Sequence, residues 1–222
     1  MLILLGFYNY TVILTYLSLI SGTIGIFSVA TSRPLIVSIV CLLLSGFFDL
    51  FDGKVARTRK KSTDDEKKFG IQLDSLADLI CFGVLPAIMG ISYGLDEKYF
   101  IVMALYVLAG LIRLAYFNVS EEKRSATEGG VRNQYDGLPI TTAAIIFPLF
   151  YCFKKCAEGH LDNAVFGYLY CGLLVAVGFA FLFNKIKIRK AKGIMIYMIG
   201  LFGLVELATV LVIYILKTKN II

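Results

Sequence analysis

Residues 49–78 read DLFDGKVARTRKKSTDDEKKFGIQLDSLAD, and this stretch lies between two long apolar runs. Asp49 and Asp52 are three residues apart, and Asp74 and Asp78 are four apart, so each pair shares one face of a helix. Two such helices facing each other bring four carboxylates to one point. Because these like charges repel one another, a cation is expected among them, and hard oxygen ligands suit Mg, Mn or Ca.

The order and spacing of small, acidic and basic residues in this stretch resemble the signature of the CDP-alcohol phosphatidyltransferase family. That signature has the form D-x2-D-G-x2-A-R followed by G-x3-D-x3-D. The matching positions here are Asp49, Asp52, Gly53, Ala56, Arg57, Gly70, Asp74 and Asp78. The gap from Arg57 to Gly70 is longer than the family's commonest spacing. The extra residues lie in the polar run 58–68, which we interpret as a surface loop.

The resemblance implies that a CDP-linked lipid donates its phosphatidyl group to an alcohol and that CMP is released. It also implies two divalent metal ions, held by Asp49, Asp52, Asp74 and Asp78. Asp78 is the implied general base for the alcohol, and Asp74 is the second implied catalytic residue. The residues implied to hold the CDP and its phosphates are Asp49, Gly53, Ala56, Arg57 and Gly70. Metal ions in such a site polarise the diphosphate and stabilise the leaving phosphate.

The composition places the chain in a membrane. It has 222 residues, of which 58% are hydrophobic, and its mean hydropathy is +0.79. Long continuous apolar runs predict an all-α, polytopic bundle of transmembrane helices. We expect a single membrane-embedded domain over residues 1–222, with a six-helix core at about 9–184 and a seventh span at about 193–216. A short interfacial helix is expected over residues 1–8. The single histidine and the absence of a C-x-x-C pair exclude zinc.

The basic residues fix the expected orientation. The predicted spans cover about residues 11–30, 34–50, 67–93, 99–119, 138–156, 164–183 and 194–216, and the second helix is expected to continue to residue 57. Lysine and arginine gather in residues 54–68, 120–137 and 185–192. The positive-inside rule places these segments in the cytoplasm, and with them the acidic site of a multi-pass cell-membrane protein. We interpret the net charge of +6 as a topology signal and not as a nucleic-acid surface.

Three flanking strings bear on the acceptor alcohol. Residues 73–87, 113–119 and 137–144 read LDSLADLICFGVLPA, RLAYFNV and GLPITTAA. They resemble the phosphatidylserine synthase branch, including its archaeal archaetidylserine type, which implies L-serine as the acceptor and a homodimer. Arginine forks bind carboxylates well. Arg113, inside an apolar run, is therefore the first candidate for the serine carboxylate, and a purely structural pairing is an equal alternative. Weaker candidates are Asn118, Arg132, Asn133 and Gln134.

Other functions stay open at this stage. A phosphorylated polyol acceptor would need a basic cluster, and Lys185, Lys187, Arg189 and Lys190 are its candidates, although a topology signal explains them better. A divalent-cation transporter would also use acids within the membrane. The acids here gather at one end of the bundle, and we expect none to line a path across it. The apolar walls do not distinguish diacyl from isoprenoid ether tails of the donor lipid.

Overall fold

The computed structural model describes residues 6–56, 58–59, 63–127, 134–189 and 194–219. In this part of the chain, 7 helices are long and apolar enough to cross a membrane. They cover Tyr10–Ala30, Leu35–Val55, Asp64–Ser92, Glu97–Arg124, Ile140–Ala157, Asn163–Leu182 and Tyr197–Leu216. The predicted all-α architecture of a multi-pass membrane protein is therefore confirmed, including the seventh span.

These spans are built from eight α-helices and several short segments. The α-helices are α1 (Ile13–Ala30), α2 (Leu35–Ala56), α3 (Asp64–Asp78), α4 (Leu85–Ser92), α5 (Phe100–Thr127), α6 (Ala143–Ala157), α7 (Asn163–Leu182) and α8 (Ile194–Thr218). The short segments are the 3-10 turns η1 (Tyr10–Val12), η3 (Glu97–Tyr99) and η4 (Ile140–Thr142), and the π-helical segment η2 (Leu79–Val84). Because η2 joins α3 directly to α4, these three segments form one continuous span.

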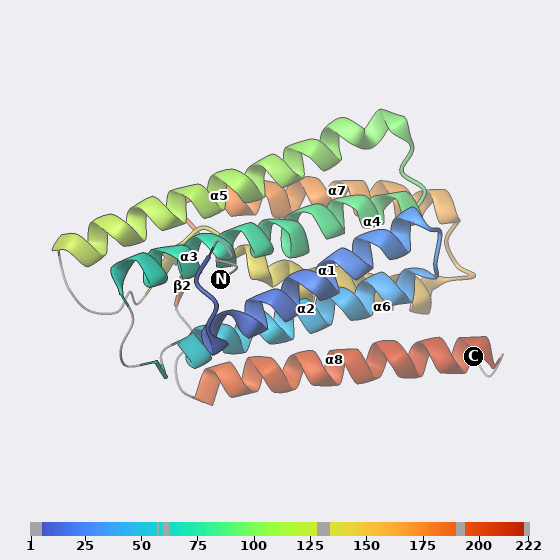
Figure 1. The fold of residues 1–222 in the computed structure, drawn as a ribbon. Helices are drawn as coiled ribbons and strands as arrows, with labels where there is room; N and C mark the ends of the chain where they lie inside the picture. Colours follow the sequence, from blue (N-terminus) through green and yellow to red (C-terminus); the bar gives the residue numbers. More distant parts are fainter. Residues whose placement is uncertain (1–5, 57, 60–62, 128–133, 190–193, 220–222) are drawn as a thin grey trace.

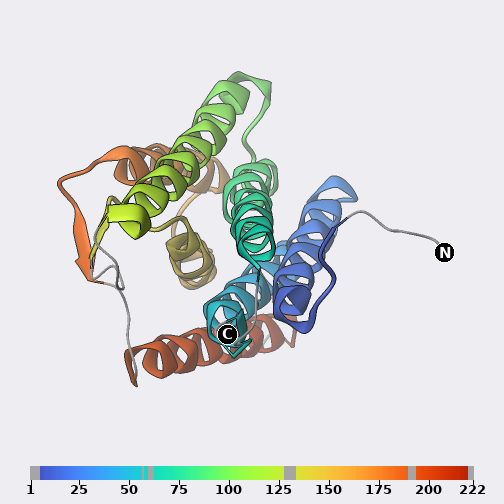
Figure 2. The same ribbon diagram turned by 60° about the vertical axis from the view of Figure 1, so that its left-hand side comes forward.

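The helices form a bundle whose polar end carries the acidic signature. Figure 1 shows the end of α2, the start of α3, the end of α5 and the start of α8 at the same end of the bundle. The view in Figure 2 shows α6 in the middle of the bundle, and α6 contacts α2, α7 and α8. Large side chains of α6 and its neighbours, such as Phe147, Phe82 and Tyr170, are fully buried. The two halves of the signature are thus presented at one end of a packed bundle.

Two polar segments that were expected to be loops are partly helical. Within residues 58–68, α3 begins at Asp64, where Thr63 and Glu66 form a capping box. The polar segment 120–137 was expected to be a loop, but α5 continues to Thr127, stabilised by an ion pair of 2.5 Å between Arg124 and Glu121 one turn apart.

The interfacial helix expected over residues 1–8 falls mostly on residues 1–5, which lie outside the described residues and leave it a prediction, and the described residues 6–8 are not helical. Helical structure begins at Tyr10, where the Asn9 side chain caps η1 by accepting from the backbone N–H of Thr11 at 3.0 Å.

A short two-stranded ribbon, which the sequence did not indicate, ties two connections together. Strand β1 (Gln134–Asp136) pairs antiparallel with β2 (Lys187–Arg189), with Tyr135 opposite Ile188. The ribbon is extended by the backbone N–H of Gly137, which donates to the Ile186 carbonyl at 2.8 Å. Gly137 has a φ of 79°, a left-handed conformation that favours glycine. The segments preceding α6 and α8 are therefore held side by side.

A ladder of serine hydrogen bonds joins α1 to α2. The hydroxyl of Ser38 donates to the Gly25 carbonyl at 3.0 Å, and that of Ser21 donates to the Cys41 carbonyl at 2.9 Å. Nearer the polar end, Ser18 and Ser45 exchange hydrogen bonds with each other's carbonyl oxygens, at 3.1 and 2.9 Å. Small polar residues let transmembrane helices approach closely and bond across the interface. The three pairs Ser18–Ser45, Ser21–Cys41 and Ser38–Gly25 are together called the Ser18–Cys41 ladder hereafter. They fix how α1 lies against the helix that carries Asp49 and Asp52.

The π-helical segment follows immediately after Asp78. Pro86 has no N–H to donate to the carbonyl of Phe82 one turn earlier. The buried hydroxyl of Tyr106 on α5 donates to that carbonyl instead, at 2.8 Å. Single π-turns inside α-helices are frequent at functional sites, because they change the face that the following residues present. Here the π-helical segment rotates α4 relative to α3, so that the acids of α3 and the buried apolar residues of α4 lie on different faces of the same span.

Candidate active site

Three of the four signature carboxylates converge on one point. Asp49, Asp74 and Asp78 each offer a carboxylate oxygen, and these oxygens all lie within 4.8 Å of one another. Asp78 is buried, whereas Asp49 and Asp74 are half-buried. The spacing of three and four residues within two facing helices therefore does bring the acids together, as the sequence predicted.

The fourth carboxylate, Asp52, completes the cluster from α2. Its side chain lies within hydrogen-bonding reach of Asp74, as that of Asp49 does of Asp78. The Thr15 hydroxyl on α1 donates to Oδ2 of Asp52 at 3.2 Å. Sequence reasoning missed Thr15, although its position one turn before the first serine of the Ser18–Cys41 ladder is a usable signal. Four carboxylates from two helices, called the acidic cluster below, thus face one another with a hydroxyl holding one of them.

The two glycines of the signature leave open space beside the acidic cluster. A Cβ built at Gly53 or at Gly70 would meet no described atom within 4 Å. In contrast, a Cβ at Gly22 on α1 would lie 2.5 Å from Sγ of Cys81, so that glycine is required by helix packing. Packing among the described residues therefore does not require glycine at these two positions, and the space beside α2 and α3 leaves room for a ligand.

Two signature positions remain predictions. Ala56 is the last residue of α2, and nothing about its side chain is described. Arg57 lies outside the described residues. The weaker acceptor candidate Arg132, with Asn133, also lies outside them, while Gln134 begins β1 and its side chain is not described.

Arg113 is buried in α5, with 6% of its surface exposed. Its Nε donates to the Leu138 carbonyl at 3.1 Å, just before η4, and its guanidinium lies 5.6 Å from the ring centre of Phe117. This contact supports the structural alternative for at least one of its nitrogens. Arg113 therefore joins α5 to the start of the α6 span, and a role toward the acceptor stays a prediction.

Asn118, one of the weaker acceptor candidates, lies closer to the signature. Its Nδ2 donates to Oγ of Ser75 at 2.8 Å. Ser75 follows Asp74 directly on α3, so this hydrogen bond joins α5 to the helix that carries two of the acids. The structure thus brings Asn118 next to the signature.

One acid within the membrane was overlooked in the sequence. Glu206 on α8 is buried, and neither of its carboxylate oxygens has a hydrogen-bond partner among the described residues. It lies nine residues beyond Tyr197, whose ring centre is 3.6 Å from the Lys54 ammonium at the polar end of the bundle. Nine helical residues span about 13 Å. Glu206 is therefore an acid away from that end, contrary to the expectation that the acids gather only there.

The donor set of the acidic cluster fits a hard divalent cation. Carboxylate oxygens are the ligands that Mg, Mn and Ca prefer, and softer metals would call for thiol or imidazole ligands. Four carboxylates at half-buried or buried positions repel one another strongly unless a cation compensates them. The arrangement can hold divalent metal ions against an anionic group that enters over Gly53 and Gly70.

With this geometry in place, the comparison with known proteins defines the class. The chain matches the CDP-alcohol phosphatidyltransferase family over residues 8–218, a range that includes α8. It therefore belongs to this family of membrane-embedded transferases, which confirms the resemblance carried by the signature.

Several curated relatives are similar within this family. The CDP-diacylglycerol–serine O-phosphatidyltransferase of Saccharomyces cerevisiae is 36% identical over 166 residues, covering 68% of this chain and 57% of the yeast protein. The archaetidylserine synthase of Methanothermobacter thermautotrophicus is 38% identical over 139 residues, which cover 61% of this chain and 55% of that protein. A further serine phosphatidyltransferase, from Helicobacter pylori strain J99, is 32% identical over 174 residues, covering 77% of this chain and 68% of its own length. The chain thus spans little more than half the length of the first two relatives.

Proposed function

We propose that this protein transfers the phosphatidyl or archaetidyl group of a CDP-linked lipid to the hydroxyl of L-serine and releases CMP. The observation that carries the proposal is the convergence of Asp49, Asp74 and Asp78, with oxygens within 4.8 Å, in a chain of the CDP-alcohol phosphatidyltransferase family. The names of the relatives from yeast, Methanothermobacter and Helicobacter support serine as the acceptor.

The residues of the acidic cluster divide the chemistry between them. Two divalent metal ions, Mg or Mn, supply charge neutralisation and polarisation of the donor's diphosphate when bound. Asp49, Asp52, Asp74 and Asp78 would hold these ions. The CDP portion of the donor would enter over the open faces of Gly53 and Gly70. Ala56 and Arg57 would also contact it.

Asp78 accepts the proton of the serine hydroxyl as the general base. The serine oxygen forms a bond to the lipid phosphorus, and the bond from that phosphorus to the oxygen of CMP breaks in the same displacement. No covalent enzyme intermediate is required, because the serine oxygen attacks the phosphorus directly.

The location of the acidic cluster suits a lipid donor. The acids lie at one end of the bundle, beside the basic segments that the positive-inside rule assigns to the cytoplasm. The donor's tails would stay in the bilayer, while its diphosphate reaches the acids at headgroup depth. We therefore place the active site on the cytoplasmic side of the cell membrane. We also propose a homodimer by family resemblance, which light scattering of the purified protein tests.

CMP release by the purified protein tests the function. The full chain in detergent is given a CDP-diacylglycerol or a CDP-linked isoprenoid ether lipid, with Mg or Mn, and one acceptor at a time. We expect CMP only with L-serine. Release only with glycerol phosphate or inositol phosphate would keep the acidic cluster but replace the acceptor. No release with any acceptor, combined with metal flux into proteoliposomes, would favour a divalent-cation transporter.

The contact between Asn118 and Ser75 allows a sharper test of acceptor binding. If Asn118 contacts serine, Asn118→Ala raises the KM for serine about tenfold, as expected for a lost polar contact of about 1–1.5 kcal/mol. Ser75→Ala removes the same 2.8 Å hydrogen bond but leaves the amide in place, so it should leave that KM nearly unchanged. Equal effects of both substitutions would show that Asn118 serves only to join α5 to α3.

A further inference from the structure

The described N-terminal residues pack against α3 and against the start of the α2–α3 connection. The ring of Phe7 meets that of Phe69 on α3 edge-on, with 5.6 Å between ring centres. A Cβ built at Gly6 would lie 3.4 Å from the same Phe69 ring. The hydroxyl of Tyr10 lies 3.0 Å from Oγ1 of Thr58, just after α2. The N-terminal segment thus contacts both the end of α2 and the start of α3.

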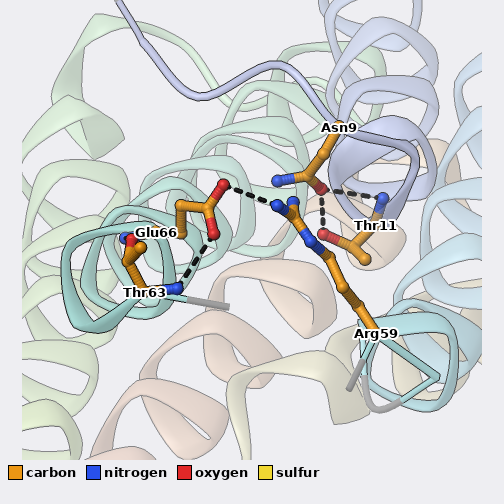
Figure 3. A network of polar contacts seen from close by, with 5 residues as sticks. All are labelled: Asn9, Thr11, Arg59, Thr63 and Glu66. Carbon is orange, nitrogen blue, oxygen red and sulfur yellow. Dashed lines mark hydrogen bonds and ion pairs between the residues drawn. The ribbon is translucent and has the colours of Figure 1, made fainter. Parts of the chain in front are cut away.

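Arg59 closes the same region from the connection itself. Its guanidinium donates to Oε1 of Glu66 at 2.7 Å. The other oxygen of Glu66 accepts from the Thr63 N–H at 3.0 Å, and the Thr63 hydroxyl accepts from the Glu66 N–H at 3.2 Å, so the two residues form a capping box at the start of α3. Figure 3 shows the Arg59 guanidinium between Glu66 and the side chain of Asn9. Three segments of the chain therefore meet at this point.

Most side chains in the first turns of α3 are exposed. The exposed side chains in these turns are Asp64, Asp65, Lys67, Lys68, Ile71 and Gln72. Glu66, Phe69 and Leu73 are less exposed, and their spacing of three and four residues places them on one face. Two residues of this face are those that Arg59 and Phe7 contact. Among the contacts described, Glu66 is thus held by the connection and Phe69 by the N-terminal segment.

We propose that Phe7, Tyr10 and Arg59 form an N-terminal clamp that positions the first turns of α3, and through them Gly70 and Asp74, relative to Asp49 and Asp52 on α2. The connection between the two helices is long, so the covalent link alone leaves their relative position loosely fixed. The clamp supplies the missing contacts on the face of α3 that leads to Asp74. Its residues act through α3 and do not touch the reacting atoms. The clamp itself does not depend on the proposed function. That function enters only where the ligand between α2 and α3 is identified as a CDP-linked lipid.

Hydrogen–deuterium exchange of the full chain in lipid nanodiscs tests the clamp without substrates. In Phe7→Ala and in Arg59→Gln, amides of residues 64–73 should exchange about three- to tenfold faster, because a partly exposed ion pair or ring contact contributes about 1 kcal/mol to local opening. Amides of α7 should exchange as in the wild type. Binding of Mn to the acidic cluster, measured by titration calorimetry, should weaken about threefold, as expected when the residues that orient metal ligands are loosened.

Matched variants separate positioning from general loss of stability. Phe27→Ala and Arg33→Gln make the same changes at exposed positions on α1 and at its connection to α2, and they should leave residues 64–73 unchanged. Arg59→Lys keeps the charge beside Glu66 and should restore most of the protection. Glu66→Gln in the Arg59→Gln background should add little, because the ion pair is already lost.

Unchanged exchange of residues 64–73 in both Phe7→Ala and Arg59→Gln would overturn the clamp. Faster exchange that extends to α7 would also overturn it, since that result indicates a loss of overall stability. If the clamp behaves as expected while no acceptor supports CMP release, the proposed function fails and the clamp stands.

Discussion

The hydroxyl of Thr15 on α1 donates a hydrogen bond to Oδ2 of Asp52 on α2, at 3.2 Å. This contact continues the Ser18–Cys41 ladder by one further turn toward the polar end of the bundle. The ladder fixes how α1 lies against α2, and Thr15 uses that position to orient one carboxylate of the acidic cluster. Groups that orient metal ligands commonly change metal affinity or activity 10- to 100-fold when removed.

Thr15→Val should therefore lower Mn affinity and CMP release about tenfold while leaving the fold intact. Thr15→Ser keeps the donor and should retain most of both. Thr23→Val is the control on the same helix, because the Thr23 hydroxyl donates only to the Leu19 carbonyl of its own helix among the contacts described. Titration calorimetry and CMP release measure the two effects, and equal losses in Thr15→Val and Thr23→Val would argue against the orienting role.

Asp78→Asn should abolish turnover, since an amide cannot take the proton of the acceptor hydroxyl. General-base catalysis is worth about 100- to 10,000-fold, so CMP release should fall by at least about 100-fold. The variant should still insert and unfold at a temperature close to that of the wild type, because the amide matches the carboxylate in size.

Asp96→Asn provides the control for this substitution. Asp96 is exposed, and its side chain caps the short η3 turn in the α4–α5 connection, which lies at the opposite end of the bundle from the acidic cluster (Figure 1). Its loss should not change CMP release. Normal activity of Asp78→Asn would refute the assignment of the general base.

Substitutions at the signature glycines separate ligand binding from folding. Gly53→Ala and Gly70→Ala add a methyl group where no described atom lies within 4 Å, so the free energy of unfolding should not fall. Filling space that a ligand needs costs about 1–3 kcal/mol, and the KM for the CDP-linked donor should rise about tenfold or more. Gly203→Ala on α8 also meets no described atom and should leave that KM unchanged. An unchanged KM in both signature variants would remove the CDP portion from this face.

The hydrogen bond from Tyr106 to the Phe82 carbonyl predicts a specific stability effect. Tyr106→Phe leaves that buried carbonyl without the hydroxyl that donates to it at 2.8 Å. The free energy of unfolding, measured by thermal unfolding in detergent, should fall by about 1–2 kcal/mol. Pro86→Ala restores an N–H one turn further on. Tyr106→Phe should therefore cost less in the Pro86→Ala background than in the wild type. Additive losses in the double variant would show that Pro86 does not create the need for Tyr106.

Much of the acidic cluster was predictable, because aspartates three or four residues apart lie on the same face of a helix. The acids at positions 49, 52, 74 and 78 need only two facing helices to converge, and long apolar runs supply those helices. The partners of these acids were harder to predict. Thr15 lies one turn before Ser18, which is a usable signal, but the sequence does not show which helix this face contacts. Asn118 was a weak candidate on the edge of an expected loop, and the structure places it on α5 beside Ser75.

The remaining differences have local physical causes. The end of α5 resembles a polar loop in composition, yet its charges pair at helical spacing, as Arg124 and Glu121 do. The π-helical segment arises where Pro86 interrupts the hydrogen-bond pattern, and the sequence shows the proline but not the phase change that follows. Strands of three residues such as β1 and β2 form only because the two connections lie side by side.

The Ser18–Cys41 ladder also bears on how the chain enters the bilayer during synthesis. α1 and α2 leave the ribosome before the other spans described. The four serines of the ladder donate to backbone carbonyls of the facing helix, and the Cys81 thiol is a later neighbour of Ser18. The two helices can therefore satisfy most of these groups as a hairpin before any later helix exists, which avoids carrying bare hydroxyls into hydrocarbon. We expect this hairpin to form at the translocon first. The helix that carries Asp74 and Asp78 would then pack against it.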